Sequence, residues 1–214
     1  MLLGLDTILV IVVLTNLLVL GSSRLATCIR SVALQGILLG VMTFAAHDSA
    51  SLLRTTLLAI ASISVKGVAF PALLFRALRE ADIRREIEPY VGYTLSILIG
   101  LAMFLLSLWL SERLPLPQVP ISSLIVPVAL CTSLIGLFVI ISRKKAITQV
   151  LGYLVLENGI YAFGVGVVPH SPLLVELGVL LDVFVAVFVM GITIFHINRQ
   201  FDHIDTDRLV LLKD

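Results

Sequence analysis

Seven long apolar stretches constrain the fold more than any other feature of this 214-residue sequence. Most are near the roughly 20 residues that an α-helix needs to cross a bilayer, and charged or turn-forming residues bound them. Hydrophobic residues make up 59% of the chain and charged residues 14%, which exceeds what a soluble domain of this length would bury. We therefore expect an all-α, polytopic integral membrane protein with about seven transmembrane helices in a single membrane domain, residues 1–214. The expected helices are about 2–21, 31–46, 52–75, 90–110, 121–141, 146–168 and 172–195.

Basic residues are distributed very unevenly among the connections. Only Arg54 and Arg113 fall on one side of the predicted membrane, and Lys66 lies within a predicted helix. Because basic residues in short loops are retained in the cytoplasm, the N-terminus is expected outside and the C-terminus in the cytoplasm. The first stretch lacks a basic leader and a small-residue cleavage site, so we expect a retained helix. The predicted cytoplasmic cations are Arg24, Arg30, Arg76, Arg79, Arg84, Arg85, Arg143, Lys144, Lys145, Arg199, Arg208 and Lys213.

Several functional classes have no support in the sequence. The net charge is +1 and no basic tract alternates with aromatic residues, so nucleic acid is not an expected partner. The two cysteines, Cys28 in a predicted cytoplasmic loop and Cys131 in the fifth helix, form no C-x-x-C pair for an iron-sulfur cluster. The histidines are scattered over both sides, and neither a metal site nor a cofactor is expected. They are His47, His170, His196 and His203.

Four ionisable residues fall inside predicted helices, where a charge costs roughly 2.5 to 3.5 kcal/mol on the insertion scale. Glu157 lies about eleven residues into the sixth helix and Asp182 about ten residues into the seventh, so both are expected near the midplane. Lys66 has a similar depth in the third helix, and Glu176 lies closer to the outer surface. These four residues are the candidate proton relay.

Two interpretations of these residues stay open. A carboxylic acid in an apolar environment can take up a proton and become neutral, so Glu157 and Asp182 can load and release protons, with Lys66 favouring the charged form. Asn158 and His196 are candidate supporting polar residues. In the alternative interpretation, Lys66 and one acid form a static pair that only fixes helix packing.

Two further patterns concern how the helices are arranged. Gly36 and Gly40 form a G-x-x-x-G step in the second helix, which predicts close approach of another helix. Helices one to three are expected to cross the membrane in the same orientations as helices five to seven. Lys66 and Asp182 then lie in corresponding helices, the third and the seventh. This pattern indicates a weak parallel repeat.

The sixth and seventh helices carry a family resemblance. The segment Gly152–Gly159, GYLVLENG, and Glu176-Leu177-Gly178 followed by Asp182 resemble hydrogenase-4 component E. That family is a membrane subunit of formate-hydrogenlyase-type, energy-converting [NiFe] hydrogenases, and the chain length and the Lys66–Pro71 segment, KGVAFP, also fit it. The C-terminal half more distantly resembles the K subunit of complex I and the C subunit of Mrp antiporters.

Comparison with the K subunit assigns the two carboxylates differently. Asp182 falls close to the carboxylate of that subunit's third helix. When Gly152 and Asn158 are matched, Leu154 takes the place of its glutamate and Glu157 lies three residues later, about one turn away. The resemblance therefore implies the same route at a shifted depth.

The resemblance implies a non-catalytic subunit in the plasma membrane of a prokaryote. Its expected partners are membrane lipid, antiporter-like and other membrane subunits and, indirectly, a peripheral hydrogenase arm that performs electron transfer. Its charges would contribute to proton or sodium translocation. A structural subunit that joins neighbouring membrane proteins is the alternative, and an autonomous transporter with its site between the repeats is a third.

Overall fold

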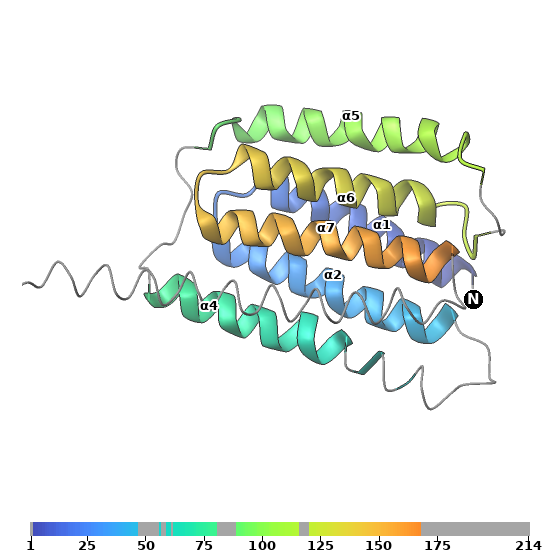
Figure 1. Cartoon of the computed structure of the whole chain (residues 1–214), viewed down its shortest axis with the longest axis horizontal. Helices are drawn as coiled ribbons and strands as arrows, with labels where there is room; N and C mark the ends of the chain where they lie inside the picture. The colour runs from blue at the N-terminus through green and yellow to red at the C-terminus, as the bar shows by residue number, and fades with distance from the viewer. Residues whose placement is uncertain are drawn as a thin grey trace, which may run out of the picture.

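The computed structural model describes residues 2–46, 56, 59–60, 62–80, 89–115 and 120–167. Within these ranges every regular element is a helix, and five of the helices are long and apolar enough to cross a membrane (Figure 1). These five are α1, α2, α5, α6 and α7. The elements are α1 Leu2–Gly21, α2 Leu25–Ala46, the π-helix η2 Ile63–Ala69, α4 Phe70–Glu80, α5 Tyr93–Ser111, α6 Ile125–Ser142 and α7 Ala146–Val167.

The second helix begins earlier than the sequence suggested. We expected it to start at residue 31, whereas α2 starts at Leu25, so Cys28 lies inside a helix and its placement in a loop is wrong. Arg30, counted with the loop cations, also lies in α2 and is exposed. The connection needs only three residues, because the amides of Thr27 and Cys28 bond back to the Arg24 carbonyl. An exposed arginine side chain can extend toward the membrane surface, so it does not end the helix.

Of the third predicted helix, residues 56, 59–60 and 62–75 are described. The π-helix η2 passes directly into α4, which ends at Glu80 and so continues beyond the predicted end at residue 75. The rest of that helix, the seventh predicted helix at 172–195, and with them Asp182, Glu176 and His196, lie outside the described residues. The orientation of the termini and the repeat remain predictions.

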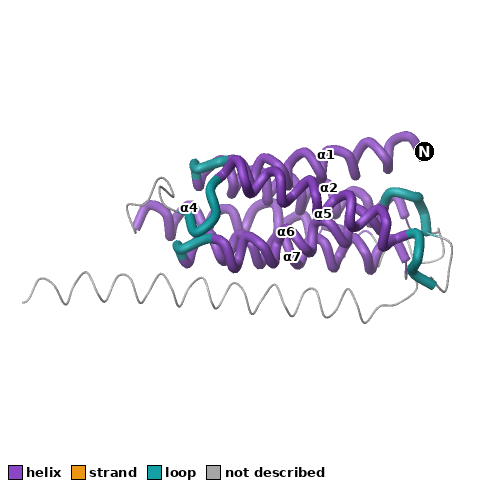
Figure 2. Tube along the Cα trace, turned by 90° about the horizontal axis from the view of Figure 1, so that it is seen from above, coloured by secondary structure: helices purple, strands orange, loops and turns teal. Residues whose placement is uncertain are grey.

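The helices run along a common axis, with α6 and α7 forming the most closely packed pair (Figures 1 and 2). The α1–α2 turn, the α6–α7 turn and the start of α5 lie at one end of the bundle, whereas the N-terminus and the end of α5 lie at the other. The first end therefore carries Arg24 and the cations of the 143–145 turn, and the opposite end carries Arg113. We call the first the basic end.

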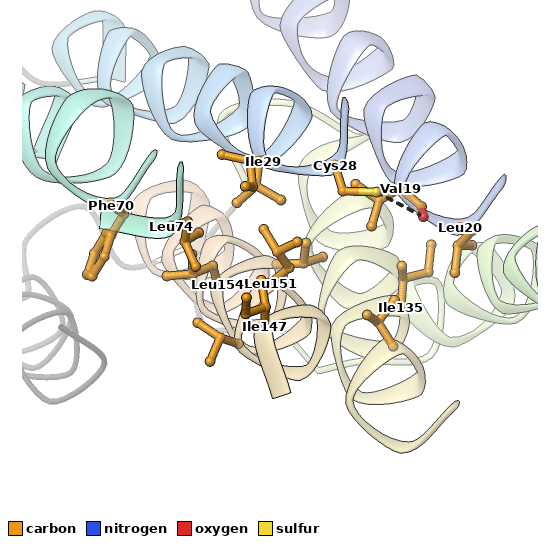
Figure 3. Close-up of a cluster of buried hydrophobic side chains, with 14 of the residues drawn as sticks. Val19, Leu20, Cys28, Ile29, Phe70, Leu74, Ile135, Ile147, Leu151 and Leu154 are labelled. Atoms are coloured by element: carbon orange, nitrogen blue, oxygen red, sulfur yellow. Dashed lines mark hydrogen bonds between the residues drawn. The ribbon is translucent and has the colours of Figure 1, made fainter. Parts of the chain in front are cut away.

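Two separate apolar clusters fill the two halves of the bundle. The cluster nearer the basic end joins α1, α2, α4, α6 and α7 through residues such as Leu20, Ile29 and Leu151 (Figure 3). The cluster in the other half includes Leu9 and Val165. On α1, α2 and α7, buried amides and one buried acid lie between these clusters.

Candidate functional site: a polar layer at mid-bundle

A layer of buried polar side chains separates the two apolar clusters. On α1, for example, Asn16 follows Leu9 of one cluster and precedes Leu20 of the other. On α7, Glu157 lies eleven residues after Ala146 and is likewise flanked by the two clusters. We call the polar layer the set Asn16, Gln35, Lys66, Thr132, Glu157 and Asn158, each at most 5% exposed.

Lys66 and Glu157 form a buried ion pair across this layer. The Lys66 Nζ lies 2.5 Å from Glu157 Oε1, and the two side chains are 5% and 3% exposed. The other carboxylate oxygen, Oε2, is buried and has no hydrogen-bond partner among the described residues. The predicted pairing of Lys66 with an intramembrane acid is therefore present, whereas the relay role of the pair is untested.

The backbone around Lys66 is placed by a glycine on α2. A Cβ added at Gly36 would lie 2.5 Å from Lys66 Cβ and 3.3 Å from the Lys66 carbonyl carbon, so only glycine permits this approach. Gly40, four residues on, faces Ile63 at the start of η2. The predicted packing role of the G-x-x-x-G step thus applies to the helix that carries the lysine. The lysine also lies in a π-helical turn, a rare conformation that is often found at functional sites.

Tyr161 provides a second partner for the lysine. The Lys66 ammonium lies 4.9 Å from the centre of the Tyr161 ring, which is within the range of a cation–π interaction. The Tyr161 hydroxyl is 2.8 Å from Thr43 Oγ1, and that threonine hydroxyl donates to the Leu39 carbonyl. Thr43 therefore holds the tyrosine ring beside the charge.

Neutral side chains extend the layer from α7 to α6. The Asn158 amide donates to Gln35 Oε1 at 3.4 Å, the Gln35 amide donates to Asn16 Oδ1 at 2.8 Å, and the Asn16 amide donates to Thr132 at 2.8 Å. Gln35 also donates to Thr15 at 3.0 Å. The chain of bonds connects α7, α2, α1 and α6, so the polar groups run across the bundle at one depth.

Replacing Gln35 with leucine should destabilise the protein by about 2 kcal/mol, because three interhelical hydrogen bonds are lost and intramembrane bonds average roughly 0.6 kcal/mol each. The measurement is unfolding of the full chain in detergent micelles. Gln149→Leu is the control, since that exposed glutamine makes one bond, to the Arg143 carbonyl at 3.1 Å. Equal effects of the two substitutions would contradict the role of the network.

A stripe of glycines on α7 brings the polar layer close to α6. Gly152, Gly159 and Gly166 recur every seven residues and so share a helix face, and a Cβ at any of them would meet atoms of α6. Glu157 projects from another face of α7, toward Lys66. The two glycines of the GYLVLENG segment therefore have a packing function, and the glutamate between them has the polar one.

The structure brings together only part of the predicted relay. It joins Lys66 to Glu157 and places Asn158 in the same layer, whereas the other three predicted residues are outside the described ranges. Sequence reasoning missed the roles of Gln35 and Tyr161. A glutamine just before the Gly36–Gly40 step was the available signal. In the described part of the chain, no group of three His, Cys, Asp or Glu residues is placed to hold a metal ion.

Comparison with known proteins identifies relatives that match most of the chain. The chain is 32% identical over 203 residues to "Uncharacterized protein Rv0085" of Mycobacterium tuberculosis, a match that covers 94% of this chain and 92% of that protein. This chain belongs to the Rv0085 family. No protein-family model matches the chain, and no solved structure matches it.

The Rv0085-family chain also has more distant homologues of known complex membership. It is 27% identical over 148 residues to hydrogenase-4 component E of Escherichia coli strain K12, covering 69% of this chain and 68% of that protein. The Shigella flexneri protein of the same name matches to the same extent. The resemblance stated from the sequence is thus supported as distant homology.

Proposed function

We propose that this chain is a membrane subunit of a hydrogenase-type energy-converting complex, and that its polar layer contributes to a proton or sodium path coupled to electron transfer. The observation that carries the proposal is the buried Lys66–Glu157 pair at mid-bundle. Intramembrane ionisable residues are costly and commonly mark ion pathways. The distant homology to hydrogenase-4 component E supports membership of such a complex.

The direction of the polar layer supports a lateral path. Hydrogen-bonded polar groups cross the described bundle from Thr132 to Asn158, next to Glu157, at one depth. Above and below them, the two apolar clusters separate the layer from both ends. Charge would therefore move along the membrane plane, toward antiporter-like subunits on either side of this chain, and not through this chain alone.

The geometry at Glu157 suggests how a proton would act. Oε2, which has no described hydrogen-bond partner, can bind a proton while Oε1 faces Lys66, and binding would convert the carboxylate to a neutral acid. The ion pair with Glu157 is then lost, while the Lys66 ammonium keeps its contact with the Tyr161 ring. Loss of the proton restores the pair. Protonation of Glu157 thus changes the local charge, and this change acts electrostatically on neighbouring ionisable groups.

The test is Glu157→Gln in the intact complex. The variant should assemble and sustain hydrogenase electron transfer, while ion translocation falls to near the uncoupled level because the amide cannot ionise. Ion movement is measured in inverted membrane vesicles beside hydrogen turnover. The control is Glu112→Gln, an exposed carboxylate at the end of α5, which should behave as wild type. Normal translocation in Glu157→Gln would refute the proposal.

A structural role is the second candidate, favoured by the hydrogen bonds that tie four helices together at mid-bundle. In that case the ion pair only fixes helix positions for neighbouring subunits. Glu157→Gln would then reduce the amount of assembled complex, and the complexes that remain would translocate ions normally. The two candidates therefore differ in coupling per assembled complex.

A further inference from the structure

The turn between α6 and α7 carries two cation–aromatic pairs at the basic end. The Lys144 ammonium lies 5.2 Å from the centre of the Tyr90 ring, and the Arg143 guanidinium lies 4.7 Å from that of Tyr93. The Tyr90 amide donates to the Ser142 carbonyl at 3.0 Å, which ties the segment before α5 to this turn. Tyr90 is 71% exposed and Lys144 is exposed. Aromatic and basic side chains of this kind are typical of the membrane–water interface.

Arg143 places a further positive charge beneath that surface. We expected it in a cytoplasmic loop, yet it is only 1% exposed because its side chain turns inward, where Nη2 donates to the Leu20 carbonyl at 2.8 Å. Its Nη1 is buried without a hydrogen-bond partner, and no carboxylate of the described chain pairs with it. The Ser142 and Thr148 hydroxyls, on either side of the turn, are also buried and have no hydrogen-bond partner among the described residues. Three cations, and three buried polar groups without a described partner, therefore lie at or beside one turn.

Exposed apolar side chains lie next to these cations. Ile141 is 76% exposed and directly precedes the turn, and Leu137 is exposed one turn deeper on α6. Leu95 and Leu98 are exposed on the first turns of α5, at the same end of the bundle (Figure 1). At this corner, cations lie above exposed aliphatic side chains. A phospholipid has the matching arrangement, with its phosphate above its acyl chains.

We propose that this corner of the bundle binds an anionic phospholipid. Its phosphate would lie at the 142–145 turn, near the side chains of Lys144 and Lys145 and within the field of the buried Arg143. Its acyl chains would run along the first turns of α5 and the last turns of α6. Charge complementarity favours an anionic headgroup, since juxtamembrane cations attract anionic lipids. This proposal is independent of the proposed ion path.

The test compares lipid retention by the full chain, purified with its accompanying subunits, in nanodiscs of phosphatidylcholine with and without phosphatidylglycerol. Replacing both Lys144 and Lys145 with glutamine should lower phosphatidylglycerol retention roughly 25-fold, at about fivefold for each lysine. The control is Arg113→Gln, because Arg113 lies over Trp109, 4.2 Å from its ring centre, in a similar pair at the opposite end of the bundle. The control should retain the lipid as wild type does.

Two outcomes would overturn the proposal. One is equal phosphatidylglycerol retention by the double variant and wild type. The other is equal thermal stabilisation by inorganic phosphate alone in phosphatidylcholine nanodiscs, which would indicate a phosphate site without lipid. Equal unfolding midpoints of all variants in pure phosphatidylcholine would show that the substitutions leave the fold intact. If the double variant has a lower unfolding midpoint in pure phosphatidylcholine, Lys144→Gln alone is measured instead. Its phosphatidylglycerol retention should fall about fivefold, and unchanged retention would overturn the proposal.

Discussion

Replacing Lys66 with methionine should destabilise the protein by about 3–5 kcal/mol, because it leaves the buried Glu157 carboxylate without its charge partner. Methionine matches much of the length of the lysine stem, so loss of packing is a small part of the effect. Both side chains of the pair are 5% exposed or less, and Glu157 Oε2 already lacks a described partner. Water can therefore compensate little for the lost ammonium group.

The double variant Lys66→Met with Glu157→Gln should recover most of that stability. Removing both charges also removes the desolvation penalty, and neutral replacements of buried ion pairs are often nearly as stable as the pair. Unfolding by denaturing detergent in mixed micelles measures the stability of the single and the double variant. Arg113→Met is the control, since an interfacial cation over an aromatic ring contributes about 1 kcal/mol or less. If Lys66→Met is as stable as wild type, the Glu157 carboxylate does not depend on Lys66 for compensation of its charge.

The same double variant separates the two proposed functions. A static pair is needed only for stability, so a stable double variant should assemble and translocate ions normally. A relay needs a group that ionises, so the double variant should assemble but remain uncoupled. Measuring assembly and coupling in one preparation therefore distinguishes a structural subunit from a proton-conducting one.

The helices and the depth of the charged residues followed from the sequence because both depend on local properties. Apolar length alone identified α1 and α7 nearly to the residue, and position within an apolar stretch placed Lys66 and Glu157 at mid-depth. Their pairing was one of the alternatives left open. Which acid faces the lysine depends on helix rotation and packing, which a linear pattern does not contain.

The neutral half of the polar layer was missed for a physical reason. An uncharged amide or hydroxyl in a membrane costs much less than a charge, so Asn16, Gln35 and Thr132 did not interrupt their apolar stretches. Each becomes significant only where four helices meet. Arg143 lies in the connection between α6 and α7, as its position after an apolar stretch indicated. Its burial could not be predicted, because it depends on contacts with α1 and α5 that lie far away in sequence.

Replacing Gly136 with valine should destabilise the protein by about 3 kcal/mol, at the upper end of the usual range for overpacking. A Cβ at Gly136 would lie 2.6 Å from Leu156 Cα and 2.7 Å from the Gly152 carbonyl oxygen. Both are backbone atoms of α7, so no side-chain rotation can relieve the clash and the two helices must separate. Leu156 directly precedes Glu157, and the displacement should therefore also weaken the contact between Glu157 and Lys66.

The matched control for this substitution is Gly4→Val, because a Cβ at Gly4 of α1 meets no atom within 4 Å. Both substitutions introduce the same β-branched residue into a helix, so they share the small difference in helix propensity and differ in the clash. Unfolding in micelles should separate them clearly, and ion coupling should fall only in the Gly136 variant. Equal stability of the two would mean that α6 and α7 tolerate separation. The glutamate would then be positioned by α2 and η2, through Gly36 and Lys66, and not by the glycine stripe of α7.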